Sequence, residues 1–229
     1  MRAWVGPFIF ASLVMVSGCS SGPKFTIADA ILADVPVSEK ENMLKMKSEM
    51  ETATEEKNKA TSDLAAADRD VSVAESEYGQ AKLEVSKNKA EVELANASKD
   101  MNKVTAAKTK LQQVEMGRDI AESKVDWQKA RRKHSKQLIE VADKHINAAS
   151  ARYEQAKAQL VVAKGKKPDA KFNATDYDRQ AGELQAKYDE AKIDADKQQL
   201  EATKMEGRYN QLVQKWQLTQ SQTQQPAPQ

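Results

Sequence analysis

The chain has few of the residues that build compact globular domains. Among its 229 residues, glycine occurs 8 times and proline 6 times, and aromatic residues make up only 5%. Turn signals and bulky core side chains are therefore scarce, whereas charged residues make up 31%. A composition dominated by Ala, Glu, Lys and Gln with so few turn residues is typical of long helices and coiled coils. We therefore expect an all-α, elongated protein.

Several kinds of chemistry also lack their usual residues. The single cysteine, Cys19, excludes an internal disulfide and any metal site with several cysteine ligands. His134 and His145 would lie about 16 Å apart along a helix, too far to share a metal ion. No phosphate-binding glycine loop, nucleophile elbow or zinc-binding His-Glu motif occurs. We therefore expect a protein that is not an enzyme, with no catalytic residues, no metal and no cofactor.

The charge balance argues against a nucleic-acid partner. The formal net charge is +2, which is almost neutral for a chain with so many ionic groups. The most basic run, residues 130–134, reads Ala-Arg-Arg-Lys-His and is predicted to be a solvated helix face.

Apolar or small residues recur at steps of three and four from Met43 to Ala95, interrupted only by Lys57 and Asn88. Such spacing keeps one narrow stripe on one side of a helix, and this stripe requires a partner helix. The members of the stripe are Met43, Met46, Met50, Ala53, Ala60, Leu64, Ala67, Val71, Ala74, Tyr78, Ala81, Val85, Val92 and Ala95.

A second stripe in a different phase runs from Val104 to Ala163. The phase changes within residues 96–102, where Asn, Ser and Asp favour turns and caps. A stutter in one very long helix, with a shorter helix folded back on it, would also explain the change. The charges at heptad position g favour a hairpin, because these edges face each other in antiparallel coiled coils. The first stripe carries Glu49, Glu56, Asp63, Asp70, Glu77, Glu84 and Glu91 there, and the second carries Lys103, Lys110, Lys124, Arg131, His145 and Arg152.

A third helix follows the clearest loop, residues 164–175, in which Gly165 suits a helix C-cap and Pro168 cannot continue a helix. We expect helices at 38–96, 102–164 and 175–218, forming an elongated antiparallel coiled-coil hairpin or three-helix bundle over residues 38–218. Ser38 and Glu41 have the spacing of a capping box at the start of the first helix. Residues 219–229 are polar, without a stripe, and are expected to be disordered.

Folding the third helix back on the second pairs large residues with small ones. This prediction places Tyr153 opposite Tyr188, Arg132 opposite Tyr209 as a cation-π contact, and Val125 opposite Trp216. The far ends of the first two helices would then project as a two-helix extension of about 20 residues each, given 1.5 Å per helical residue.

The N-terminal segment has the features of an export signal. Arg2 precedes an apolar run that ends at Val16 and is too short to be a comfortable membrane span. The following residues, Val16-Ser17-Gly18-Cys19, resemble the lipobox of bacterial lipoproteins. This resemblance implies that residues 1–18 are a signal peptide and that Cys19 becomes the first residue of the mature chain. It also implies that Cys19 carries a thioether-linked diacylglycerol and a further acyl group, such as palmitate, on its amine.

Several acyl chains on one residue would anchor the protein stably in a membrane. Ser20 stands where Asp favours inner-membrane retention in enteric bacteria, so the resemblance implies the outer membrane, with the protein facing the periplasm. Residues 19–37 would form the lipidated tether. The apolar octet from Phe25 to Leu32 within it either docks on the helical body or lies at the lipid surface.

The chain thus resembles bacterial outer-membrane lipoproteins with a coiled-coil body. The resemblance implies a lipid-anchored, non-enzymatic spacer or scaffold of the cell envelope that associates through its helix faces with a protein partner or with itself. The alternative is a helical accessory or regulator that docks on an export channel or envelope enzyme. A covalent link to peptidoglycan through a C-terminal Lys, known in such lipoproteins, is not carried over, because the chain ends in Pro226-Ala227-Pro228-Gln229.

Overall fold

The computed structural model describes residues 22–223. Its body consists of three long helices, α1 (Glu41–Ala97), α2 (Met101–Ala163) and α3 (Ala174–Thr223), preceded by two short 3₁₀ helices, η1 (Asp29–Leu32) and η2 (Val37–Glu39). Within residues 22–223 there is no strand, and none of the helices there combines the length and hydrophobicity needed to cross a membrane. The all-α prediction is confirmed, and the alternative of one continuous first helix is wrong.

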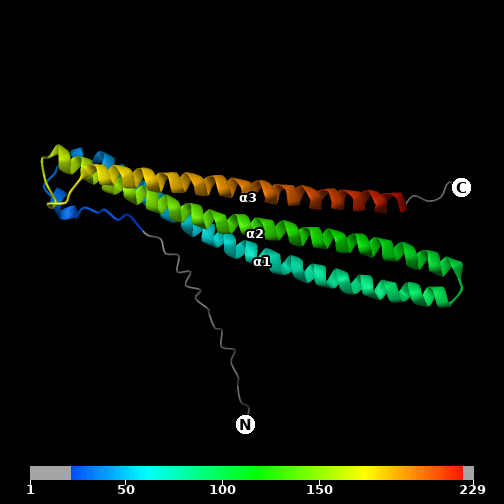
Figure 1. The fold of residues 1–229 in the computed structure, drawn as a ribbon. Coiled ribbons are helices and arrows are strands. Elements are labelled where there is room, and N and C mark those ends of the chain that lie inside the picture. The colour runs from blue at the N-terminus through cyan, green and yellow to red at the C-terminus, as the bar shows by residue number, and fades with distance from the viewer. Residues whose placement is uncertain (1–21, 224–229) are drawn as a thin grey trace, which may run out of the picture.

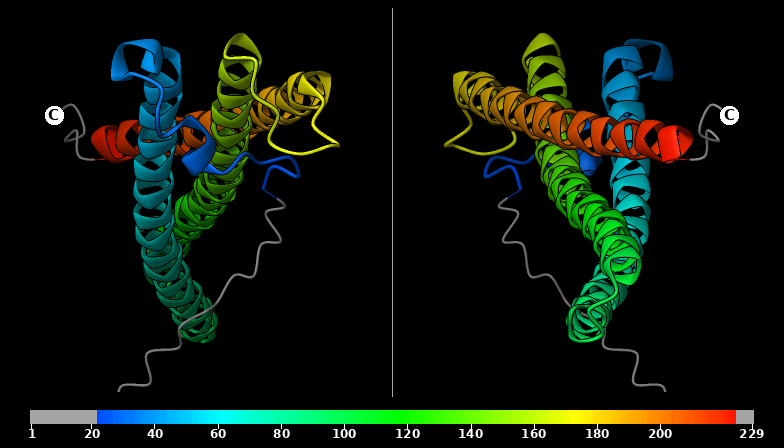
Figure 2. Two further views of the ribbon diagram at one scale, coloured as in Figure 1. Left: turned by 90° about the vertical axis from the view of Figure 1, so that its left-hand side faces the viewer. Right: turned by 90° about the vertical axis from the view of Figure 1, so that its right-hand side faces the viewer.

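The three helices form a rod with α2 at its centre. Helices α1 and α3 both run antiparallel to α2 and pack against it (Figure 1). In the described part of the chain, α1 and α3 do not pack against each other, and the views along the rod show them leaving α2 in different directions (Figure 2). Helix α2 has 63 residues, so the rod is about 95 Å long. The central helix therefore carries two seams, one for each neighbour.

Small side chains build the seam between α1 and α2. Ala53, Ala60, Ala67 and Ala74 recur every seven residues on α1 and are all buried. Alanine at these positions lets the two helices approach closely, so one continuous contact forms along the rod. The two interruptions of the stripe behave differently. Lys57 reaches out of the seam to Asp143 at 2.7 Å.

Asn88, the other interruption, stays inside the seam. Its side chain is only 2% exposed, and Nδ2 donates a hydrogen bond of 2.9 Å to the Glu84 carbonyl oxygen one turn earlier. A single polar residue in an otherwise apolar seam disfavours alternative alignments, at some cost in stability.

A row of ion pairs along the same seam confirms the predicted pairing of g positions. Each step of seven or fourteen residues along α1 is matched by an equal backward step along α2, as an antiparallel pair requires. The pairs are Glu91–Lys110 at 2.9 Å, Glu77–Lys124 at 2.6 Å, Asp70–Arg131 at 3.2 Å, Glu56–His145 at 2.8 Å and Glu49–Arg152 at 3.1 Å.

Both reversals of the chain lie where the sequence predicts them. Between α1 and α2, Lys99 adopts a left-handed conformation with φ 55°, and the Asp100 carboxylate caps α2 by accepting from the backbone N–H groups of Asn102 and Lys103. After α2, Gly165 has φ 62°, and its N–H donates to the Val162 carbonyl. Glycine adopts this conformation without a steric penalty, and it closes the helix as expected.

The predicted capping box at Ser38 is wrong. Helix α1 begins at Glu41, and Lys40 at its N-cap makes no side-chain capping bond. The backbone N–H groups of Glu39 and Lys40 instead donate to the carbonyls of Pro36 and Val37, which forms η2. The chain needs this tight turn because it must reverse from the preceding segment into α1.

Helix α3 extends five residues beyond the expected end at Leu218, to Thr223. Polar residues are accommodated there because Thr219 and Ser221 donate their hydroxyl groups to the carbonyls of Lys215 and Gln217, four residues earlier. The expected disorder of residues 219–229 is therefore wrong for 219–223, and residues 224–229 lie outside the described part.

The predicted pairing of α2 with α3 has the correct direction but the wrong register. Tyr188 stacks on His145, at 4.5 Å between ring centroids, and not on Tyr153. Tyr209 stacks on Trp127 at 5.4 Å, and Arg132 instead pairs with Asp68 of α1 at 2.5 Å. The observed register differs from the predicted one by about one heptad, a slip that superimposes one apolar stripe on its own repeat.

This slip also shortens the projecting two-helix extension. Helix α3 reaches the level of Thr109 on α2, where Trp216 and Gln220 line a shared groove. Only the first residues of α2 and the last residues of α1 extend beyond the end of α3 (Figure 1). The prediction of about 20 projecting residues on each helix is therefore too long.

Candidate functional site

Residues 24–35, here called the strap, are held on the rod by side chains of α2 and α3. The strap runs along the rod towards the end where α1 and α3 begin and α2 ends (Figure 1). The octet Phe25–Leu32 therefore docks on the helical body, which is one of the two alternatives that the sequence leaves open. The contacts of the strap join the N-terminal segment to all three helices.

A glutamine of α3 fixes the beginning of the strap. The Oε1 atom of Gln180 accepts hydrogen bonds from the backbone N–H groups of Lys24 at 2.6 Å and Phe25 at 3.0 Å, and its Nε2 donates to the Phe25 carbonyl at 3.3 Å. Gln180 is itself only 6% exposed. Nearby, the Tyr177 hydroxyl donates to the Thr26 carbonyl at 3.4 Å. The amide of Gln180 thus both accepts hydrogen bonds from the strap backbone and donates one to it.

Two buried charges of α2 hold the next residue of the strap. The carboxylate Oε2 of Glu154 accepts from the backbone N–H of Ile27 at 2.7 Å, and the Lys157 ammonium donates to the Ile27 carbonyl at 2.9 Å. Lys157 also pairs with Glu154 at 2.9 Å and with Asp29 at 2.6 Å, and its Nζ lies 4.4 Å from the centre of the Tyr153 ring. Both polar groups of the Ile27 backbone are therefore satisfied by charged partners.

The cluster keeps its charges despite its burial. Burial opposes the charged form of Lys157, but the hydrogen bonds that its ammonium donates to Asp29 and Glu154 outweigh this effect and raise the pKa of the ammonium above its ordinary value. The hydrogen bond from Lys157 lowers the pKa of the Asp29 carboxyl. Burial raises the pKa of the Tyr153 hydroxyl, which remains neutral beside them. The strap is thus held by the Lys157 ammonium, which lies between the carboxyl groups of Asp29 and Glu154.

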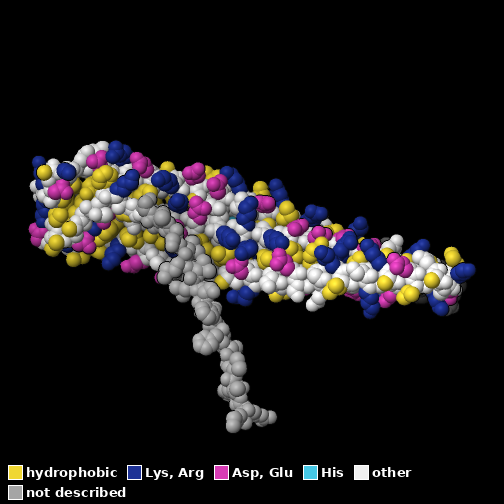
Figure 3. All heavy atoms as spheres, turned by 60° about the horizontal axis from the view of Figure 1, so that its bottom comes forward, with side chains coloured by type: hydrophobic (Ala, Val, Ile, Leu, Met, Phe, Trp, Pro, Cys, Tyr) yellow, Lys and Arg dark blue, Asp and Glu magenta, His cyan; other side chains and the backbone are white. Residues whose placement is uncertain are grey.

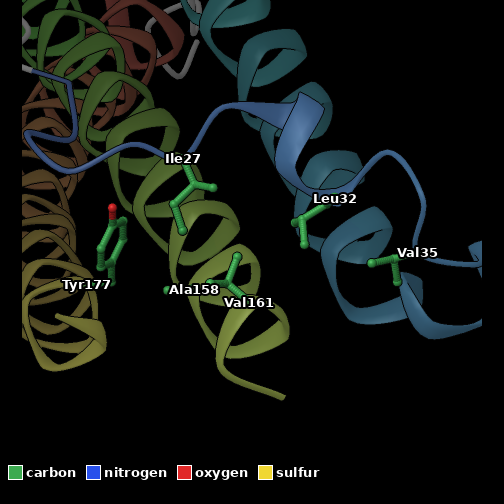
Figure 4. Packing of buried hydrophobic residues seen from close by; sticks show 6 residues of the cluster. All are labelled: Ile27, Leu32, Val35, Ala158, Val161 and Tyr177. Carbon is green, nitrogen blue, oxygen red and sulfur yellow. The ribbon is translucent and has the colours of Figure 1, made fainter. Parts of the chain in front are cut away.

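Hydrophobic side chains of the strap complete the attachment. Ile27, Leu32 and Val35 are buried with Ala158 and Val161 of α2 and Tyr177 of α3 (Figure 4). Ile27 lies over α2, and η1, which contains Leu32, also packs on α2, whereas η2 packs on α1, so the chain crosses from one helix to the other. Because these side chains are removed from water at one end of the rod, the strap supplies a core that the alanine-rich seams lack.

Lysines after α2 hold the far end of the strap. Lys166 donates to the Ile31 carbonyl at 2.8 Å and pairs with Asp34, and Lys164 pairs with Glu39. The hydrogen bond from Lys166 lowers the pKa of Asp34. The strap is consequently fixed from Lys24 to the turn before α1.

A second candidate surface lies at the opposite end of the rod. Leu83 and Leu94 of α1 are each 73% exposed, and Met101 at the start of α2 is 75% exposed. Further back, a groove of about 440 Å³ between α2 and α3 contains Met116, Leu212 and Trp216. Exposed apolar side chains near the end of a charged hairpin are suited to helix-face docking.

The residues predicted for lipidation, Val16, Ser17, Gly18 and Cys19, lie outside the described residues. Of the two histidines, His145 pairs with Glu56 and stacks on Tyr188, and His134 lies beside Trp127 in a shallow groove. Residues 22–223 contain no group of three His, Cys, Asp or Glu side chains arranged to bind a metal ion.

Sequence reasoning did not identify Glu154, Lys157 or Gln180 as special. The chain contains 34 acidic and 36 basic residues, so one buried pair has no distinguishing signal among them. The only usable signal was the apolar octet Phe25–Leu32, which lies outside the heptad pattern and therefore requires its own partner surface.

Comparisons of the chain with protein-family models, with curated proteins and with solved structures found no match.

Proposed function

We propose that this protein is a lipid-anchored, non-enzymatic scaffold of the bacterial cell envelope, held at the outer membrane by acyl chains on Cys19 and facing the periplasm. Its activity is to place a stiff helical rod at the membrane, where the helix faces bind a protein partner or a second copy. The proposal combines the lipobox-like residues 16–19 with the rod that follows them.

The attachment of the strap to the rod by Gln180, Glu154 and Lys157, here called the clamp, is the observation that carries this proposal. Cys19 is three residues before Gly22, and the chain from Lys24 onward is bound to the rod by Gln180, Glu154 and Lys157. A lipid anchor positions a rod only if the segment between them is short or fixed. Here the segment is short in sequence and the chain is fixed from Lys24 onward, which is the arrangement that a membrane-positioned scaffold requires.

Lipidation is tested with the full-length protein expressed in a diderm bacterium. Cells are fed an alkyne-tagged fatty acid, the protein is isolated, and the N-terminal peptide is examined by mass spectrometry. We expect label and acyl mass on Cys19 in the wild type, with recovery in the outer-membrane fraction. The Cys19→Ser variant should incorporate no label. A mature wild-type protein with an unmodified thiol would contradict the proposal.

A second function is favoured by the exposed tip of the α1–α2 hairpin, namely docking on an export channel or an envelope enzyme. Its support is the apolar exposure of Leu83, Leu94 and Met101 described above. Photo-crosslinkers placed at positions 83, 94 and 101 in living cells distinguish the two readings. Capture of one envelope protein at all three positions favours docking, whereas capture of the same chain alone favours a self-assembling scaffold.

A further inference from the structure

The chain leaves the rod from its flank and not from its end. Gly22, Lys24 and Phe25 line a hollow of about 250 Å³ together with residues 179–187 of α3, including Leu184 and Lys187. Figure 1 shows the same feature, since the first described residues lie along the rod, away from its end. Any anchor before Gly22 is therefore joined to the side of the rod.

The segment between Cys19 and this exit point is short. Cys19 and Gly22 are three residues apart in the sequence, and three extended residues span at most about 11 Å. Because Gln180 holds the backbone of Lys24 and Phe25, no further length is available while the strap is bound. The lipid surface must then lie within about 11 Å of Gly22.

The rod continues beyond the exit point in both directions. Leu184 lies ten residues after the first residue of α3, so about 15 Å of helix separates the exit point from that end of the rod. The loop between α2 and α3 lies at the same end, and Lys164, Lys167 and Lys171 are exposed there. An upright rod standing on this end would hold the exit point about 15 Å above the lipid surface, farther than the tether of about 11 Å can span.

We infer that the rod reclines along the membrane, with the flank of α3 around residues 179–187 facing the lipid headgroups. This inference rests on the proposed lipidation of Cys19, and it commits to a lipid surface as the occupant of that flank. The length of chain before Gly22 and its point of exit fix the orientation.

The charges and shape of the flank agree with a lipid surface. Lys24, Arg179 and Lys187 line the hollow and face headgroup phosphates in this orientation, and Glu183 is the acidic residue among the lining side chains. Arg179 also pairs with Asp176 at 2.9 Å, so it contributes less than a free cation. Hydrophobic side chains gather at the strap end of the rod on the face shown in Figure 3, and charged side chains of both signs are scattered along the remainder of that face. The attachment therefore depends on the anchor and the strap more than on a basic patch.

The inference also assigns a role to the strap, which sets the effective length of the tether. If the clamp opened, the chain from Cys19 to Lys40 would become available, an increase from about 11 Å to more than 60 Å of extended length. A rod on such a tether is free to stand away from the membrane.

The experiment measures the thickness of the protein layer on a supported phospholipid bilayer by neutron reflectometry. It uses the full-length lipidated protein, purified from bacterial membranes in detergent and bound to the bilayer. A reclining rod gives a layer of about 20–30 Å, the width of two helices, whereas an upright rod gives about 95 Å. A wild-type layer thicker than about 60 Å would overturn the inference, because it exceeds what a reclining rod of this width can fill.

A strap-release variant, Glu154→Gln combined with Gln180→Ala, tests the cause of the orientation. We expect its layer to become at least twofold thicker while circular dichroism shows unchanged helicity. The matched control is Gln199→Ala, which changes an exposed glutamine of α3 outside residues 179–187, and it should match the wild type. An unchanged thickness in the strap variant would overturn the role given to the strap.

The two proposals fail in distinguishable ways. If wild-type protein carries no acyl chain and forms no more of a bilayer-bound layer than Cys19→Ser does, the proposed lipid anchoring fails. If it is acylated and bound but forms a thick layer, anchoring stands and only the reclining orientation is overturned.

Discussion

Glu154 on α2 accepts a hydrogen bond of 2.7 Å from the backbone N–H of Ile27, which lies 127 residues earlier in the chain. The same carboxylate pairs with Lys157, whose ammonium donates to the Ile27 carbonyl. This arrangement joins the N-terminal segment to the middle helix of the rod by charges that are almost completely buried. The stability of the strap should therefore depend strongly on Glu154.

Replacing Glu154 with alanine should release the strap. The change leaves the buried ammonium of Lys157 with Asp29 as its remaining carboxylate, and breaking a buried pair in this way costs about 3 kcal/mol. We expect faster amide hydrogen exchange in residues 24–35 and a lower free energy of unfolding in urea. The exposed Glu93, changed to alanine, serves as the control and should leave both unchanged. Full exchange protection of residues 24–35 in the Glu154→Ala variant would show that the other contacts, including those of Gln180 and Lys166, hold the strap without Glu154.

Reversing one charge in the row of ion pairs should lower the stability, and reversing its partner as well should restore it. Glu77→Lys places two ammonium groups against each other at Lys124 and should lower the free energy of unfolding by about 0.5–1 kcal/mol, as expected for an exposed pair. Adding Lys124→Glu restores the attraction with exchanged signs and should recover most of the loss. The measurement is a double-mutant cycle by urea denaturation at low salt. A cycle with no coupling would mean that this row does not help to set the register.

The register of α2 against α3 can be tested by crosslinking. Gln155 donates a hydrogen bond of 2.8 Å to Asp178, so cysteines at these two positions should be joined efficiently by a short bifunctional thiol reagent in a Cys19→Ser background. The control pair, Gln155 with Ala186, is the neighbour in the register that the sequence predicts, and it should react poorly because about 12 Å of helix separates positions 178 and 186. Preferential joining of the control pair would contradict the observed register.

Acidification should weaken the body of the rod through His134. Burial lowers the pKa of this imidazole below its ordinary value of 6.5, although Asp196 acts in the opposite direction. The unfolded chain therefore binds a proton first as the pH falls below about 6.5, so the free energy of unfolding decreases until the folded imidazole is also protonated. We expect His134→Gln to reduce the loss of stability between pH 7 and pH 5, measured by urea denaturation. If the free energy of unfolding of the variant depended on pH as that of the wild type does, His134 would not be the cause of the loss of stability.

The sequence predicted the helices and the α1–α2 hairpin well because both depend on local, repeated features. Asn, Ser and Asp within residues 96–102 indicate the turn. The acidic edge of α1 from Glu49 to Glu91 is complementary to the basic edge of α2 from Lys110 to Arg152. Charges in a row distinguish one direction of pairing from the other.

The register of α3 could not be predicted in the same way. Its apolar stripe matches α2 almost equally well after a shift of seven residues, and only specific neighbours such as His145 with Tyr188 separate the two alignments. The docking site of the strap could not be predicted either, because the octet Phe25–Leu32 has no helical periodicity that would specify which helix it contacts. The contacts of Glu154 and Lys157 with Ile27 arise only once the strap and α2, which are distant in the sequence, meet.

The sharing of α2 between two neighbours that do not pack against each other makes the protein modular in length. Both of its seams repeat every seven residues, so removing or duplicating one heptad in all three helices together would change the length of the rod by about 10.5 Å while leaving the end that holds the strap unchanged. The length of such a rod can therefore change in steps of one heptad without a change in how its helices pack.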